Sequence, residues 1–262
     1  MFFDRDRYLY RKAQLIEVIC QLRFPTILSI SAREPVDFQE AIRRDFPQYQ
    51  RLMEQPKPRL SGGSGNYRVE EAQPITNYQF ISADGKWKVN LTNSFVSLAT
   101  HAYTTWEDMA AKLDLVLAQF IPIYQPAYFE RVGLRFINIF SRKTLGVEDV
   151  PFRELFQPAY LGLLGEDDVQ EQSFSLAAQD VELAIPGGCR VKMHAGPGMV
   201  QNGNKKDSEV KFILDNDVFM NGKLPVAQCA PALQTIHIQA DRIFAGAITE
   251  RLHEAMEPTL LD

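Results

Sequence analysis

Alternating apolar and polar residues predict two strands that open the two halves of the chain. Within residues 13–24, one set of positions is apolar and the set between them is mostly polar, which is the period of two that a half-buried strand requires. The apolar set is Ile16, Val18, Cys20, Leu22 and Phe24, and the other set is Glu17, Ile19, Gln21 and Arg23. The same alternation recurs over residues 129–140, where arginine and apolar side chains take opposite faces. Both segments are therefore expected to be strands with one buried face.

Helical spacing, capping residues and turn residues predict the remaining elements. Four helices are expected. One begins at a capping box formed by Thr104 and Glu107 and ends at Pro122, and the others cover residues 35–46, about 152–164, and 231–256. Further strands are expected over 78–82, 86–91, 95–100, 173–183, 190–194 and 210–214. Residues 55–65 are rich in proline and glycine and are expected to be a loop, and 202–204 a turn.

Each half then reads strand, helix, three strands, helix, which predicts an α+β protein with antiparallel sheets and packed helices. The halves, residues 1–124 and 125–262, are expected to form one compact unit. Their opening strands read EVICQLRF and ERVGLRFI. This similarity suggests two pseudo-equivalent halves, but it is too short to separate a duplication from chance. Whether the halves share one sheet also stays open.

Composition narrows the class of protein. The chain has 28 Lys and Arg against 33 Asp and Glu, a net charge of −5, and 45% hydrophobic residues, which excludes a disordered chain. It lacks an apolar run of the ~20 residues that a spanning helix needs. Acidic residues occupy the N-terminus where a signal peptide is apolar. Three widely separated cysteines indicate reduced thiols, so a cytoplasmic protein without membrane contact is expected.

Four segments resemble those of one known family: IEVICQLRFP (16–25), TTWED (104–108), ERVGLRFIN (130–138) and ILDNDVF (213–219). The family is a sporadically distributed, uncharacterised group of bacterial proteins of about this length. Its most specific piece is RVGLRFIN. The resemblance implies a bacterial, cytoplasmic protein with the family's fold, and it implies no activity and no catalytic residue.

Motifs for cofactor chemistry are incomplete. Residues 62–65 (GGSG) are not followed by the Gly-Lys-Ser/Thr of a P-loop, and 196–198 (GPG) lack the third glycine of a dinucleotide fingerprint. The four histidines show no metal-ligand spacing. No cofactor, no metal and no catalytic residue are therefore predicted.

Two pairs of polar residues leave alternatives open. Asp215 and Asp217 lie one residue apart and have the chemistry of a divalent-cation site, although the asparagines and glycine nearby favour a turn. His237 and Asp241 share a helical face, where a surface hydrogen bond or simple solvation is the alternative to a metal-ligand pair. Cys20 falls on the apolar face of its strand and is expected in the core.

The predicted binding site consists of the polar faces of the two opening strands. Glu17, Gln21 and Arg23 project from the first strand, and Arg131 and Arg135 from the second. If these strands pair, the five side chains share one sheet face, where rigidly held arginines suit a carboxylate or phosphate. The alternative is a solvated face with cross-strand pairs such as Glu17 to Arg131. An alternating segment, Lys86, Lys88 and Asn90, would extend this face.

We therefore predict a non-enzymatic binding protein for a partner protein or a small anionic ligand. An enzyme with an unrecognised site, drawing on Asp215, Asp217, His237 or Glu17, is the first alternative. Nucleic-acid binding through the N-terminal arm is the second; it is less favoured because aspartates dilute the arm's charge and the chain is acidic. The basic residues of this arm are Arg5, Arg7, Arg11 and Lys12. A homodimer through the last helix is a further alternative to packing of that helix within the chain.

Overall fold

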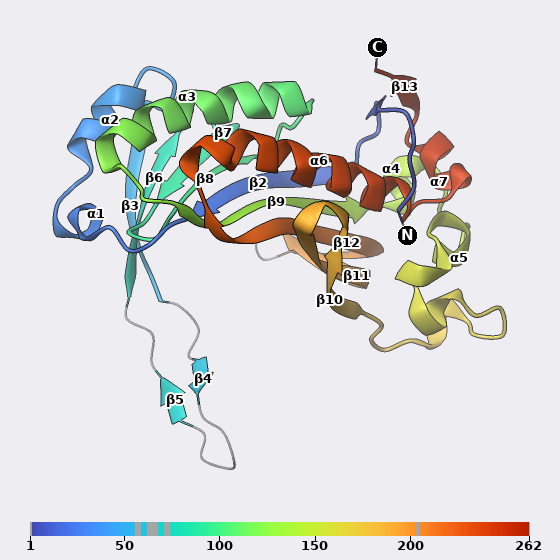
Figure 1. Cartoon of the computed structure of the whole chain (residues 1–262). Coiled ribbons are helices and arrows are strands. Elements are labelled where there is room, and N and C mark those ends of the chain that lie inside the picture. The colour runs from blue at the N-terminus through green and yellow to red at the C-terminus, as the bar shows by residue number, and fades with distance from the viewer. Residues whose placement is uncertain (1, 56–58, 62–67, 71–73, 203–204, 262) are drawn as a thin grey trace.

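The computed structural model describes residues 2–55, 59–61, 68–70, 74–202 and 205–261. These residues form an α+β fold with a nine-stranded antiparallel sheet, as the sequence predicts (Figure 1). In spatial order the strands are β10 (Gln179–Ile185), β11 (Cys189–Asn202), β12 (Lys205–Leu224), β9 (Phe129–Phe140), β2 (Leu15–Arg23), β8 (Phe95–Thr100), β7 (Trp87–Leu91), β6 (Ile75–Ile81) and β3 (Gln48–Glu54).

The two opening strands meet at the centre of this sheet. β2 and β9 pair antiparallel, with Cys20 opposite Leu134 and Gln21 opposite Gly133. The strands of the first half extend outward from β2 and those of the second half from β9, so the halves share one sheet. The first half contributes four strands beyond β2 rather than the predicted three. The additional strand, β3, is exposed along its whole length, so it lacks the apolar alternation that would have predicted it.

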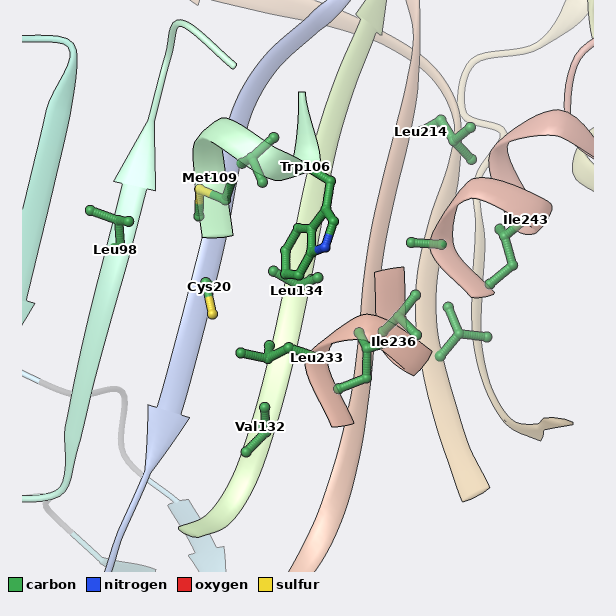
Figure 2. Close-up of a cluster of buried hydrophobic side chains, with 14 of the residues drawn as sticks. Cys20, Leu98, Trp106, Met109, Val132, Leu134, Leu214, Leu233, Ile236 and Ile243 are labelled. Carbon is green, nitrogen blue, oxygen red and sulfur yellow. The ribbon is translucent and has the colours of Figure 1, made fainter. Parts of the chain in front are cut away.

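Two long helices cover one face of the sheet (Figure 1). α3 (Trp106–Tyr124) follows β8, and α6 (Cys229–Ala245) follows the end of β12. Figure 2 shows Trp106 of α3 and Leu233 of α6 beside Leu134 of β9. Burying this apolar side of the sheet is the main source of stability, and α6 packs within the chain. The remaining helices are α1 (Leu28–Ala32), α2 (Val36–Ile42), α4 (Arg142–Leu145), α5 (Phe152–Leu155) and α7 (Glu250–Ala255).

Several predicted boundaries are wrong for local reasons. The last helix does not continue over 231–256: α6 ends at Ala245, and Thr249 caps the separate helix α7. Thr105 rather than Thr104 caps α3, because its side chain accepts the amide of Asp108 at 3.2 Å. The predicted helix over 152–164 is a short α5 followed by 3₁₀ turns.

Two predictions fall partly outside the described residues. The segment expected to be a loop contains β4 (Arg59–Ser61), which pairs with β5 (Arg68–Glu70), whereas residues 62–65 are not described. In the expected turn at 202–204, residues 203 and 204 are likewise outside the described part, and β11 and β12 pair on either side of them.

The N-terminal and C-terminal segments lie side by side near the end of α6 (Figure 1). β1 (Tyr8–Tyr10) pairs antiparallel with β13 (Pro258–Leu260) in a small separate sheet. Ion pairs from Arg5 to Glu250 at 2.6 Å and from Lys12 to Glu257 at 3.0 Å hold this N-terminal arm in place. Among the described residues, no helix is long and apolar enough to cross a membrane.

Candidate functional site

All five predicted site residues lie on the sheet face opposite α3 and α6. In β2, Val18, Cys20 and Leu22 are fully buried, so the residues between them point to the other face. The strand register places Arg23 opposite Arg131 and Ile19 opposite Arg135. We call this surface the polar face. It is defined by Glu17, Gln21, Arg23, Gln50, Gln79, Lys88, Asn90, Ser97, Arg131, Arg135, Arg190, Asp215 and Asp217.

The arginines of β9 are paired with carboxylates of β12. Arg131 Nη2 donates to Asp217 Oδ1 at 2.6 Å. Arg135 donates through Nε to Asp215 Oδ1 at 2.8 Å and through Nη2 to Oδ2 at 2.5 Å, and this bond raises the pKa of Arg135. An anionic ligand at these arginines would therefore compete with two intramolecular carboxylates.

One expectation about this face is wrong, and one pair named for the alternative interpretation does not form. Asp215 and Asp217 lie within β12, not in a turn, because residues 205–224 form one continuous strand. Glu17 does not pair with Arg131; it lies opposite Ile137, and its Oε1 is 3.7 Å from His101 Nε2. The strand register decides which side chains meet, and the residues of one strand alone do not show how it aligns with its neighbour.

The first half of the polar face carries a line of uncharged hydrogen-bonding side chains, which we call the amide row. The strand registers align its members across five neighbouring strands. They are Gln50, Gln79, Asn90, Ser97 and Gln21. Asn90 links the row, because its Oδ1 accepts from Gln79 Nε2 at 3.0 Å and its Nδ2 donates to Ser97 Oγ at 3.2 Å.

Two basic side chains flank the amide row on opposite sides. Arg23 lies two residues beyond Gln21 in β2, and Lys88 lies two residues before Asn90 in β7. Within the described residues neither forms an ion pair, in contrast to Arg131 and Arg135. These two cations are free to meet an external anion.

The basic residues of the N-terminal arm are all engaged. Arg7 donates to both carboxylate oxygens of Glu107 at 2.8 and 2.9 Å, which lowers the pKa of Glu107 to about 2. Arg5 and Lys12 form the ion pairs described above, and Arg11 pairs with Glu257. Nucleic-acid binding through this arm would have to break these contacts, since phosphates need free cations.

The residues named for an unrecognised enzyme site do not lie together in the structure. Asp215 and Asp217 lie on the polar face, whereas His237 is buried on α6, which covers the opposite face. The surface setting expected for His237 is therefore wrong. Its Nε2 is 3.5 Å from Asp241 Oδ2, and burial lowers the pKa of His237 to about 4. No group of three possible metal ligands occurs within the described ranges.

The cysteines occupy buried positions. Cys20 lies in the core, as predicted, and Cys189 and Cys229 are buried free thiols. Burial raises the pKa of Cys229 to about 12 and raises that of Cys189. Because the thiolate is the nucleophile, neither environment activates its sulfur.

The sequence interpretation missed a cavity of about 530 Å³ beneath the N-terminal arm. Asn138 of β9 and Asn216 of β12 line it from the sheet side, and both are almost fully buried. The signal was present in the sequence, because each asparagine interrupts a set of apolar residues on the core-facing side of its strand: Phe136 and Phe140 flank one, Leu214 and Val218 the other.

Comparison of the chain with protein-family models found no match, and comparison with curated proteins found none either.

Proposed function

We propose that this chain is a non-enzymatic binding protein that recognises an extended acidic segment of a partner protein across its polar face. The observation that carries the proposal is the amide row between Arg23 and Lys88. Amide and hydroxyl groups suit the polar groups of a bound polypeptide, and the two cations suit carboxylates.

The spacing of the two cations favours an extended chain over a small ion. They are separated by two strand-to-strand steps and, along the strands, by four residues. With about 4.8 Å per step and about 3.3 Å per residue, this separation is roughly 16 Å. An extended segment of about five residues covers that distance, whereas one small dicarboxylate does not.

The charges on the second half of the polar face argue against a long nucleic acid as the partner. The second half of the polar face pairs Arg131, Arg135 and Arg190 with carboxylates. A phosphate backbone would meet these carboxylates as well as the cations, which disfavours it. An acidic segment that spans Arg23 and Lys88 crosses β2, β8 and β7 and does not have to reach these carboxylates.

Fluorescence anisotropy with a labelled hexaglutamate peptide at low salt tests the proposal. We expect the double variant Arg23→Ala/Lys88→Ala to bind about tenfold more weakly than wild type, a loss of ~1.4 kcal/mol. The matched control is Arg43→Ala/Arg44→Ala, which removes two exposed arginines after α2 and should leave binding unchanged.

Three results would overturn the proposal. One is equal weakening in both double variants, which would indicate non-specific charge attraction. Another is full competition by free glutarate, which would identify a small-anion site. The third is tighter binding of an oligothymidylate than of the peptide, which would favour nucleic acid. Circular dichroism of each variant establishes that the fold is retained.

A further inference from the structure

The cavity beneath the N-terminal arm has the size and composition of a small-molecule site. Its volume of about 530 Å³ lies within the range of ligand pockets, which are mostly apolar with a few placed polar groups. The apolar part of the cavity wall includes Leu15, Phe136, Phe244 and Met256, and Tyr10 of the N-terminal arm also lines the cavity.

The sheet side of the cavity carries a buried amide without a full set of partners. Asn216 is 2% exposed, and its Oδ1 accepts no hydrogen bond in the structure. Asn138, its diagonal neighbour on β9, donates to the carbonyl of Leu214 at 3.4 Å. A buried acceptor without a partner is destabilising. Asn216 therefore does not stabilise the apolar surroundings in which it lies, and its position requires another explanation.

A carboxyl group lies on the α6 side of the same cavity. Asp241 keeps 48% of its side-chain surface accessible. Its neighbour His237 is neutral at physiological pH, because burial lowers the pKa of His237 to about 4. Arg7 donates to both oxygens of Glu107 and, within the described part of the chain, forms no hydrogen bond to Asp241.

Two polar groups of the cavity can therefore accept hydrogen bonds from a ligand. Asn216 Oδ1 and the Asp241 carboxylate can both accept from N–H or O–H donors. Among the described residues that line the cavity, Arg11 carries the one guanidinium, and it is paired with Glu257. Aromatic rings of Tyr8, Tyr10 and Tyr103 add faces that attract a cation or stack on an aromatic body.

We infer that this cavity binds a small amphipathic amine, with an apolar or aromatic body between the arm and the sheet and its donor-bearing end toward Asn216 and Asp241. The site lies on the opposite side of the sheet from the polar face. The inference therefore does not depend on the proposed function.

Thermal shift and two-dimensional NMR with three matched probes test this inference. The probes are tryptamine, indole without the amine, and indole-3-propionate with an anion in its place. We expect tryptamine to raise the melting temperature of wild type by several degrees through binding to the folded state. Indole should have a smaller effect, and indole-3-propionate none.

Variants separate a binding role from a structural one. Asn216→Leu replaces the unpartnered acceptor with an apolar side chain of similar volume. This variant should have a higher melting temperature than wild type, and tryptamine should no longer raise it. Ala240→Phe fills the cavity from α6 and should abolish binding of tryptamine and indole alike. The polar-face variant Arg23→Ala/Lys88→Ala should bind tryptamine as wild type does.

Two outcomes would overturn the inference. One is unchanged tryptamine binding by Asn216→Leu, which would place the ligand elsewhere. The other is an absence of shifts for arm and α6 resonances with all three probes at millimolar concentration. If Ala240→Phe fails to fold, Asn216→Leu still decides the question, because its stability is expected to increase.

Discussion

Arg131 reaches Asp217 by lying across Gly133. The strand register places Asn221, not Asp217, opposite Arg131. The guanidinium nevertheless donates to Asp217 at 2.6 Å and lies 4.3 Å from the centre of the Phe219 ring. The guanidinium can lie there because residue 133 is a glycine; a Cβ at this position would lie 2.7 Å from Arg131 Nη1.

The Arg131–Asp217 pair should contribute measurably to stability. Its side chains are 16% and 27% exposed, so water screens them only in part. We expect a double-mutant cycle with Arg131→Ala and Asp217→Ala to give a coupling energy of about 1 kcal/mol in urea unfolding. The exposed pair between Arg33, which follows α1, and Asp37 of α2 is the control and should give at most ~0.5 kcal/mol. Equal couplings would contradict this reasoning.

Gly133→Ala should break the same pair without touching either charge. The new methyl group would displace the guanidinium and would also lie 3.1 Å from Phe219 Cβ. We expect the Arg131–Asp217 coupling to fall toward zero when the cycle is repeated in the Gly133→Ala background. An undiminished coupling would mean that the guanidinium reaches Asp217 by another path.

Asn90→Ala should destabilise the amide row more than Gln21→Ala does. Asn90 bonds to Gln79 and Ser97 and accepts from Asn77 at 3.3 Å. Its loss leaves buried polar atoms with fewer partners, at a cost of ~1–3 kcal/mol. Gln21 makes no such side-chain bonds within the described residues, so Gln21→Ala should cost under ~0.5 kcal/mol. Urea denaturation midpoints of the two variants test the ranking.

His237 and Asp241 should give opposite pH dependences of stability. Burial lowers the pKa of His237 to about 4, so its stabilising contribution is present above its unfolded pKa of 6.5 and is lost as pH falls toward 4. This is ~3 kcal/mol at full protonation of the unfolded state. Partial burial raises the pKa of Asp241 to about 7, so its contribution decreases as pH rises from about 4 to 7. Arg7 and Glu107, the charged groups facing both residues, oppose each other.

Single variants should separate these two contributions. We expect His237→Gln to gain stability relative to wild type on going from about pH 7 to pH 4.5, and Asp241→Asn to lose it. Tryptophan fluorescence during urea unfolding follows both, since Trp106 lies 4.8 Å from the His237 ring. Parallel pH profiles of the two variants would show that the pair does not titrate as described.

Local patterns explain how much of the fold the sequence predicts. Alternation in β2 and β9 depends only on neighbouring residues, so these strands and the faces of their side chains are predicted correctly. One detail differs: Ile16 is 44% exposed, because the pairing of β2 with β9 is irregular between Leu15 and Glu17. The alternation predicts a buried Ile16 only if β2 and β9 pair without interruption.

The tertiary structure decided what lies beside these local elements. Which aspartate each arginine meets depends on the register of β9 with β12, some 80 residues later in the chain. The cavity joins Leu15, Asn216 and Asp241, which only folding brings together. Composition and periodicity thus determined the α+β class and the polar face. Partners and cavity required the tertiary structure, because they depend on distances between segments that no local pattern encodes.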